Sequence, residues 1–159
     1  MKIREITPAE FVAAGDLCVR AYEVGGHLEP GNDYAKTIRN VAHRAEQALV
    51  LVAELGGQLV GTVTICAPGS EYAEICGPGE QEFRFLAVEP AAWGQGIGRR
   101  LVAECVERGQ GLASQLVICV IDINAAGRRF YEKLGFERLP ERDLEPWPGI
   151  NLQAYRKLL

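Results

Sequence analysis

Residues 82–109 read EFRFLAVEPAAWGQGIGRRLVAECVERG and carry the strongest structural signals in the chain. Residues 82–88 are rich in aromatic and apolar side chains and predict a strand. From Gly96 to Gly109 the apolar residues recur with a helical period, which is typical of a helix with one apolar face. The apolar run Leu116–Ile121 then predicts a strand buried on both faces. A strand, a helix and a strand of these lengths predict a βαβ unit with a right-handed crossover.

The segments on either side of this unit predict further strands and helices, arranged as a mixed α/β sandwich around one sheet. Gly56-Gly57 is a hairpin signal between two β-rich runs, and Asp33 is placed to cap a helix. The expected strands are 2–6, 48–55, 58–66, 82–88, 116–121, 136–139 and 149–158, and the expected helices are 8–23, 33–47, 96–109 and 124–134. Residues 67–80 and the charged, proline-bearing stretch before the last strand are expected to be loops.

The composition is that of an ordinary globular protein, with 48% apolar and 24% charged residues in a chain of 159. We expect a single domain spanning residues 1–159. The net charge of −4 argues against non-specific nucleic-acid binding, which needs clustered positive charge. No apolar run approaches the roughly 20 residues that span a bilayer, and no apolar signal segment follows Met1. A cytoplasmic protein that does not contact membranes is therefore expected, and a homodimer is left open.

The cysteines and histidines predict neither disulfides nor a metal site. The cysteine count of five is odd, no pair has C-x-x-C spacing, and Cys105 and Cys119 lie among apolar residues. This pattern indicates reduced thiols used as small core residues. His27 and His43 have no cysteine at ligand spacing and form no H-E-x-x-H motif, so no metal is expected. A cysteine–histidine nucleophile pair is left open.

The glycine cluster GQGIG, residues 94–98, joins the predicted strand to the predicted helix. Placing Gly96 and Gly98 in the first helical turn costs about 2 kcal/mol relative to alanine, so a benefit must offset it. One benefit is a tight turn with close helix–sheet packing; the other is an anion cradle, in which unpaired N–H groups stabilise a phosphate. The glycines fit neither the dinucleotide fingerprint G-x-G-x-x-G nor the Walker loop, because no glycine follows at the required position and no lysine follows the cluster.

This cluster closely resembles the pyrophosphate-binding motif of the GNAT superfamily of acyl-CoA N-acetyltransferases, usually written [RQ]-x-x-G-x-[GA]. The resemblance extends upstream to residues 85–90 (FLAVEP) and downstream to Asn124, residues 130–133 (FYEK) and residues 135–136 (GF). It implies a GNAT-like fold, with helices on both faces of a mixed, largely antiparallel sheet and a βαβ unit that binds acetyl-CoA. It also implies transfer of the acetyl group to a primary amine of a small molecule, peptide or protein, with CoA as product and no metal.

The sequence departs from the family pattern at two positions. Trp93 stands where the family usually has Arg or Gln, which puts a side-chain contact to the cofactor in doubt. Gly127 replaces an alanine commonly found three residues after the asparagine, a small-for-small change expected to matter little.

By resemblance, Glu82 is the general base that deprotonates the amine, and Tyr131 protonates or hydrogen-bonds the departing thiolate. Other readings stay open: Glu82 as a solvated carboxylate, Tyr131 as a core aromatic and Asn124 as a helix cap. Arg84 lies two residues after Glu82 and could pair with it, which would lower the pKa of the carboxylate.

The resemblance also assigns the cofactor and the acceptor. The implied cofactor-binding residues are Leu86, Ala87, Val88, Trp93, Gly94, Gln95, Gly96, Ile97, Gly98, Arg99, Asn124 and Arg129. Tyr22 and Tyr34 are the candidate acceptor-binding residues, among loop and helix residues that also include Glu23, Glu71, Tyr72, Glu74 and Asp143. A rival function is a non-catalytic acyl-CoA sensor on the same fold, which would need neither Glu82 nor Tyr131.

Overall fold

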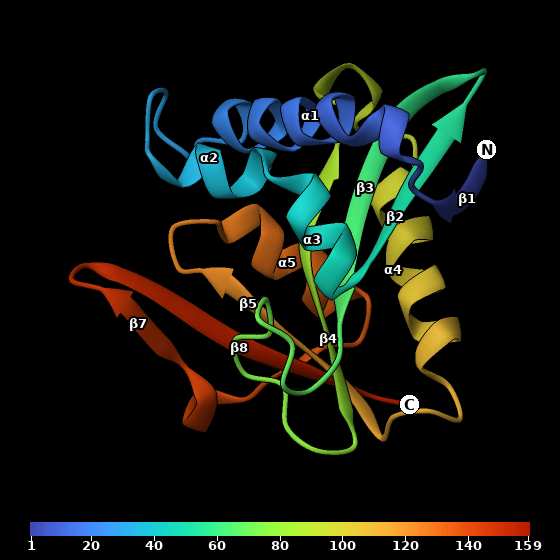
Figure 1. Cartoon of the computed structure of the whole chain (residues 1–159). Coiled ribbons are helices and arrows are strands. Elements are labelled where there is room, and N and C mark those ends of the chain that lie inside the picture. Colours follow the sequence, from blue (N-terminus) through green and yellow to red (C-terminus); the bar gives the residue numbers. More distant parts are fainter.

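One eight-stranded sheet runs through the molecule, between two layers of helices (Figure 1). The computed structural model describes all residues, 1–159. The strands are β1 (Lys2–Glu5), β2 (Leu49–Leu55), β3 (Gln58–Cys66), β4 (Glu80–Val88), β5 (Gln115–Ile121), β6 (Glu137–Arg138), β7 (Leu144–Trp147) and β8 (Ile150–Leu158). The α-helices are α1 (Phe11–Val24), α2 (Tyr34–Arg39), α3 (Val41–Gln47), α4 (Ile97–Gly109) and α5 (Ala125–Lys133). Short 3-10 helices are η1 (Pro8–Glu10), η2 (Pro90–Ala92) and η3 (Pro140–Arg142).

The strand order is β1-β2-β3-β4-β5-β8-β6, with β7 paired to the outer part of β8. Every pair is antiparallel except β4 and β5, which are parallel and joined by α4. The prediction of a mixed, largely antiparallel sheet with one βαβ unit is therefore confirmed. The parallel pairing is short, since it ends at Glu82 and Val117, and beyond these residues the two strands diverge (Figure 1).

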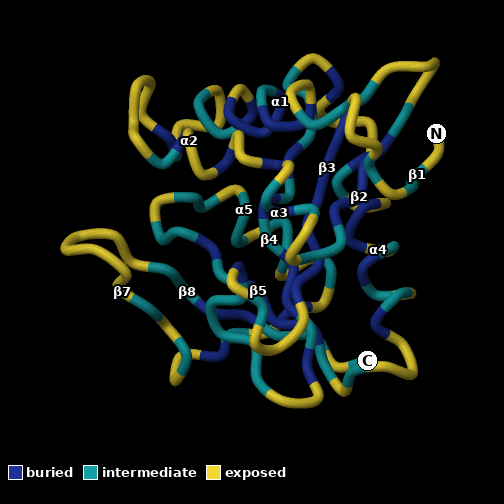
Figure 2. The backbone as a smooth tube through the Cα atoms, in the orientation of Figure 1, coloured by how far each residue is buried: buried dark blue, intermediate teal, exposed yellow.

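Each face of the sheet packs on its own hydrophobic core, and the central strands are buried between the two (Figure 2). The core beneath α4 has Leu101, Cys105 and Phe83 at its centre. Helix α4 lies close to the sheet because Gly61 of β3 has no side chain: a Cβ there would lie 2.9 Å from Leu101 Cδ1. On the other face, α1 and α2 cover β3 and β4, with Leu17 and Ile38 buried against the strands. The two cores fix β4 and α4 relative to each other.

The helix expected over residues 33–47 is wrong in one respect, because it is broken at Asn40. Asn40 leaves the helical conformation (φ −77°, ψ 58°) and becomes the N-cap of α3. Its side-chain oxygen accepts a hydrogen bond from the His43 N–H at 3.5 Å. Asparagine favours this capping role over a helix interior. The break lets Ile38 of α2 and Val41 of α3 both be buried.

The C-terminal strands also differ from the prediction. The strand expected over residues 136–139 is only β6, Glu137–Arg138, because Pro140 has no N–H to continue the pairing and starts η3. The stretch expected as a loop contains β7, which forms a hairpin with β8 around Gly149 at φ 82°. This hairpin reaches outward from the sheet (Figure 1).

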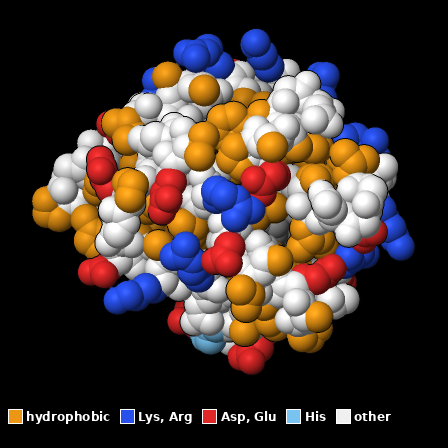
Figure 3. All heavy atoms as spheres, turned by 90° about the horizontal axis from the view of Figure 1, so that it is seen from above, with side chains coloured by type: hydrophobic (Ala, Val, Ile, Leu, Met, Phe, Trp, Pro, Cys, Tyr) orange, Lys and Arg blue, Asp and Glu red, His pale blue; other side chains and the backbone are white.

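The surface on the α1 side mixes charges of both signs (Figure 3). Helices α1 and α2 are joined by the exposed ion pair Arg39–Asp16, 2.9 Å apart, and Arg20 of α1 lies 2.5 Å from Glu89. This face therefore lacks the continuous basic patch that favours a polyanion. No helix has both the length and the apolar character needed to cross a bilayer.

Candidate active site

A β-bulge in β4 marks the point where the sheet opens. Thr64 pairs with Arg84 and Thr62 pairs with Ala87, so β4 has one extra residue opposite β3. Phe85, within the bulge, has φ 54° and is the only non-glycine residue with a positive φ. A bulge bends the strand that carries it and increases its twist. Here the bend follows directly after the last β4–β5 pair, so β4 turns away from β5.

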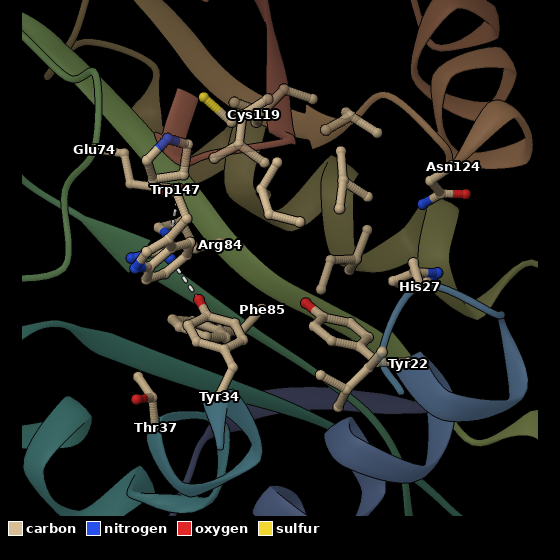
Figure 4. A pocket seen from close by; sticks show the side chains of 18 of the residues that line it. Tyr22, His27, Tyr34, Thr37, Glu74, Arg84, Phe85, Cys119, Asn124 and Trp147 are labelled. Atoms are coloured by element: carbon tan, nitrogen blue, oxygen red, sulfur yellow. Dashed lines mark hydrogen bonds and ion pairs between the residues drawn. The ribbon is translucent and has the colours of Figure 1, made fainter. Parts of the chain in front are cut away.

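The opening between β4 and β5 forms the main cavity, about 720 Å³ in volume. Its walls come from both strands, from α1, α2 and the segment between them, from α5 with its cap Asn124, and from the β7–β8 hairpin. The cavity is elongated (Figure 4). We call one end the Asn124 end, for Asn124 and His27, and the other the Arg84 end, for Arg84, Glu74, Tyr34 and Trp147.

The glycine loop follows the end of β4 and leads into α4. Gly94 and Gly96 have φ of 81° and 80°, a conformation that disfavours any side chain, and a Cβ at either position would meet no neighbouring atom. Gly96 is the N-cap of α4, and no side chain caps this helix. The N–H groups of the first turn are thus free to bind an anion at the positive helix end. These features fit the pyrophosphate of CoA.

Trp93, at the position where the family usually has Arg or Gln, makes a contact of its own. Its indole N–H donates to the Val88 carbonyl at 2.8 Å, while 48% of the residue stays exposed. The ring therefore joins the start of the glycine loop to the end of β4. Arg99 on α4 and Arg129 on α5 are exposed and have no ion-pair partner within the chain, so both guanidinium groups are free to meet phosphates.

Asn124 lies on the cavity wall and also caps α5, as its side-chain oxygen accepts from the Gly127 N–H at 2.9 Å. The glycine at 127, expected to differ little from the family's alanine, bears on how this side chain lies. A Cβ on Gly127 would lie 2.8 Å from Asn124 Cγ and 3.1 Å from its Oδ1, so the asparagine would have to rotate. Gly127 thus allows the Asn124 side chain to fold over the helix end.

Tyr131 shares the cavity wall with Asn124, as their spacing of two helical turns predicts. Its ring packs against three phenylalanines, Phe83, Phe130 and Phe136, with centroids 6.0, 5.1 and 5.6 Å away. Burial raises the pKa of its hydroxyl, so the group stays protonated. No protein atom hydrogen-bonds this hydroxyl, which leaves it available to a ligand in the cavity.

Glu82 is fully buried and does not line the cavity. Its carboxylate accepts hydrogen bonds from the backbone N–H groups of Glu74, Ile75 and Cys76, at 2.9 to 3.1 Å. Burial raises the pKa of Glu82, against the opposing effect of these donors. The suggested pairing with Arg84 is wrong, because that guanidinium bonds other groups. Glu82 therefore anchors the loop that precedes β4.

Arg84 organises its end of the cavity (Figure 4). Its Nε lies 3.0 Å from the Glu74 carboxylate, and its two terminal nitrogens donate to the Tyr72 carbonyl at 2.7 Å and the Tyr34 hydroxyl at 2.9 Å. Tyr34 in turn meets Trp147 edge to face, with ring centroids 6.0 Å apart. One side chain of β4 thereby ties together a loop, α2 and the β7–β8 hairpin.

The bulge residue Phe85 lies between two guanidinium groups. Arg44 is 4.2 Å and Arg84 is 4.6 Å from the ring centroid, both within cation–π range. Arg44 is only 1% exposed and has no carboxylate partner, and burial lowers its pKa. It donates instead to the Thr64 hydroxyl and the Thr37 carbonyl, each at 3.2 Å. The paired cations hold the strained Phe85 backbone in place.

Several cavity residues escaped the sequence analysis. His27, which no motif assigns to a cofactor or acceptor site, lines the Asn124 end with its ring centroid 4.9 Å from that of Tyr22. Burial lowers the pKa of His27, so its ring is neutral at neutral pH. No local motif signals His27, Cys119 or Trp147, since each reaches the cavity only through the tertiary fold. Of the residues sequence reasoning did name, Tyr22, Tyr34, Glu74, Leu86, Asn124 and Tyr131 line the cavity, whereas Glu23, Ala87, Val88 and Asp143 do not.

A protein-family model matches much of the chain that forms this site. The acetyltransferase (GNAT) domain matches residues 46–138, more than half of the chain, which include the bulged strand, the glycine loop and α5. The protein belongs to the GNAT acetyltransferase family. A comparison with curated protein sequences found no match.

Solved structures share the fold over nearly the whole chain. Ribosomal-protein-alanine N-acetyltransferase from Brucella melitensis is 25% identical, with all of both chains covered and a TM-score of 0.71. The protein yncA from Salmonella typhimurium, solved with its cofactor acetyl-CoA, is 21% identical over 99% of this chain and 93% of its own, with a TM-score of 0.69. An aminoglycoside 6'-N-acetyltransferase complexed with coenzyme A is 17% identical over 99% and 97%, with a TM-score of 0.71.

Proposed function

We propose that the protein is an N-acetyltransferase that moves the acetyl group of acetyl-CoA directly onto a primary amine. One observation carries the proposal: the opening between β4 and β5 has a free tyrosine hydroxyl on its wall, and β4 leads from it to a helix start without a side-chain cap. Family membership supports the same reaction class.

The cofactor would lie along β4 and the glycine loop. Because β4 has no β5 partner beyond Glu82, the peptide groups on that edge, toward Leu86, are available to the pantetheine arm and to the thioester carbonyl. The N–H groups around Gly96 would hold the pyrophosphate, with Arg99 and Arg129 beside them. Acetyl-CoA supplies the acetyl thioester, and the C–S bond breaks as the amine nitrogen forms the new bond to the carbonyl carbon.

Tyr131 would serve the leaving group. A buried, protonated hydroxyl without a protein partner can donate a hydrogen bond to a thiolate sulfur as negative charge forms there. Full proton transfer from a tyrosine with a raised pKa to a thiolate is uphill. We therefore assign Tyr131 the role of hydrogen-bond donor to the sulfur, with the thiolate finally protonated by solvent.

Two carboxylates compete for the amine proton. Glu82, expected from the sequence, has the raised pKa that a base needs, but its oxygens are enclosed by three peptide N–H groups. Glu74 lies on the cavity wall beside Arg84. We assign proton removal to Glu74, directly or through one water, because its carboxylate is on the cavity wall, where Arg84 holds it in place, whereas that of Glu82 is not. Glu82 has the task of positioning the Glu74 loop.

The test is release of free thiol from acetyl-CoA in the presence of a panel of primary amines, with CoA-dependent thermal stabilisation measured in parallel. Amine-dependent thiol release is expected. Stabilisation by CoA without any amine-dependent release would instead support the acyl-CoA sensor, for which an enclosed Glu82 would be no handicap. The absence of both effects would exclude either function.

A further inference from the structure

The charges of the main cavity are few and already paired. Besides His27, its charged lining residues are Asp33, Glu74 and Arg84. Glu74 and Arg84 neutralise each other at 3.0 Å. The Asp33 side chain is 95% exposed and lies 3.5 Å from Lys36, so it belongs to the rim. The interior therefore offers no free carboxylate to a second positive charge on a ligand.

Aromatic rings dominate the Arg84 end instead. Tyr34 and Trp147 meet edge to face there, and Phe85 lies behind them. The Arg84 guanidinium holds the Tyr34 hydroxyl at 2.9 Å, so the ring keeps a fixed orientation. Trp147 is 57% exposed although it stands at a cavity wall, and Ile150 and Leu152 of β8 extend the apolar surface beside it. A ligand that covers this indole would remove a large apolar area from water.

The two ends of the cavity differ in what they can accommodate. The Asn124 end belongs with the glycine loop and the proposed path of the pantetheine arm. The Arg84 end is then left for the acceptor, whose amine must lie near Glu74 and whose body must lie against Tyr34 and Trp147. A polycationic acceptor would desolvate charges here without partners, which is unfavourable.

We infer that the acceptor is a monoamine whose primary amine is joined by a short linker to a flat, uncharged apolar body, as in an arylalkylamine. This inference rests on the proposed function, and it assigns Tyr34 and Trp147 as specificity-determining residues. On the far side of these rings, a second cavity of about 490 Å³ contains Glu71, 3.4 Å from His43. That carboxylate lies outside the main cavity.

The first experiment compares kcat/KM for phenethylamine and tryptamine with values for spermidine, kanamycin and a short peptide with N-terminal alanine, all with acetyl-CoA. The aromatic amines are expected to exceed the others by about tenfold or more. A preference for spermidine or kanamycin would overturn the inference, as would a preference for the peptide, while leaving the acetyltransferase function intact. If no amine releases thiol, the proposed function fails, and the acceptor class with it.

The second experiment uses Trp147→Ala, with Glu145→Ala as the matched control, an exposed residue of the same strand that does not line the cavity. Trp147→Ala should raise the KM for the aromatic amine about tenfold while the KM for acetyl-CoA stays unchanged. Glu145→Ala should change neither. An equal loss with every amine would show that Trp147 only supports the hairpin and would overturn its assignment.

Discussion

The glycine loop and the Arg84 end lie on either side of the same opening, yet they are built in opposite ways. The glycine loop presents backbone N–H groups, and the residues that shape it lie close together in the sequence. The Arg84 end presents side chains from four separate segments, brought together by Tyr34, Glu74, Arg84 and Trp147. Backbone recognition suits a cofactor that does not vary, whereas side-chain recognition can change with the acceptor.

The largest expected effect is the loss of CoA binding when the glycine loop is altered. Gly96→Val should weaken CoA binding by at least about a hundredfold, roughly 3 kcal/mol, because a β-branched residue at φ 80° must move the loop. CoA-dependent stabilisation, measured by thermal shift, should disappear. Gly57→Val is the matched control, since Gly57 has φ 79° and open surroundings in the β2–β3 turn. Equal loss of CoA binding in both variants would contradict the proposal that the N–H groups around Gly96 bind the pyrophosphate.

The next largest effect is expected from removing the proposed base at the Arg84 end. Glu74→Gln should lower kcat about a hundredfold or more, because the amine must then lose its proton unaided. Glu82→Gln should destabilise the loop at residues 74–76 and lower kcat less. Because burial raises the pKa of Glu82, a rising limb of the pH–rate profile that vanishes in Glu82→Gln would reverse the assignment. Rates of both variants, normalised to the folded fraction, decide between them.

Tyr131 lines the cavity with a hydroxyl that no protein atom hydrogen-bonds, so its loss should affect chemistry and leave binding intact. Tyr131→Phe should lower kcat by about ten- to a thousandfold with little change in the KM for acetyl-CoA. Tyr155→Phe is the control, because it also loses a hydroxyl, the donor to Glu132 at 3.1 Å, but lies outside the cavity. An unaltered kcat in Tyr131→Phe would show that the Tyr131 hydroxyl has no role in the reaction and that the ring only packs.

The smallest effect concerns acid stability near the side-chain end. Arg142 holds the Glu80 carboxylate at 2.6 Å and lowers its pKa to about 2, and the same arginine donates to the Ile75 carbonyl. A folded-state pKa below the unfolded value of about 4.5 stabilises the fold above that pH, and the contribution is lost as the pH falls toward 2.

We expect this pair to contribute on the order of 2 kcal/mol at neutral pH, discounted for the partial exposure of Arg142. Denaturant unfolding of Glu80→Gln should show the loss at pH 6, with a smaller difference from wild type at pH 3. A difference that stays constant across this range would show that Arg142 does not lower the pKa of Glu80.

Most of the fold could be predicted because its signals are local. The apolar run Leu116–Ile121 and the glycine cluster each determine their own segment, so the βαβ unit is where expected. The break at Asn40 and strand β7 were missed for a common reason. Asn40 leaves the helix so that Ile38 and Val41 can both be buried, and β7, which contains Pro146, exists only through its pairing with β8.

The candidate site also contains residues with local sequence signals and residues whose position depends on tertiary contacts. The positions of Gly96, Asn124 and Tyr131 in the fold follow from motif and helical period, so where they lie could be predicted, while their roles toward a cofactor stay predictions. A pairing of Arg84 with Glu82 was open because residues two apart on a strand share one face, but the guanidinium instead bonds Glu74, Tyr72 and Tyr34. Trp147 carries no local signal, because its place beside Tyr34 depends on a contact across more than a hundred residues.

The distribution of tryptophan has a practical consequence. The chain contains only two, Trp93 bonded to the end of β4 beside the glycine loop and Trp147 at the Arg84 end, and both are about half exposed. Indole fluorescence responds to the polarity around the ring, so each tryptophan reports on one of the two proposed substrate sites. If the proposed sites are correct, the emission left in Trp147→Phe changes when the cofactor binds, and the emission left in Trp93→Phe changes when the acceptor binds. The order in which the two substrates bind can then be measured from intrinsic fluorescence, without a label.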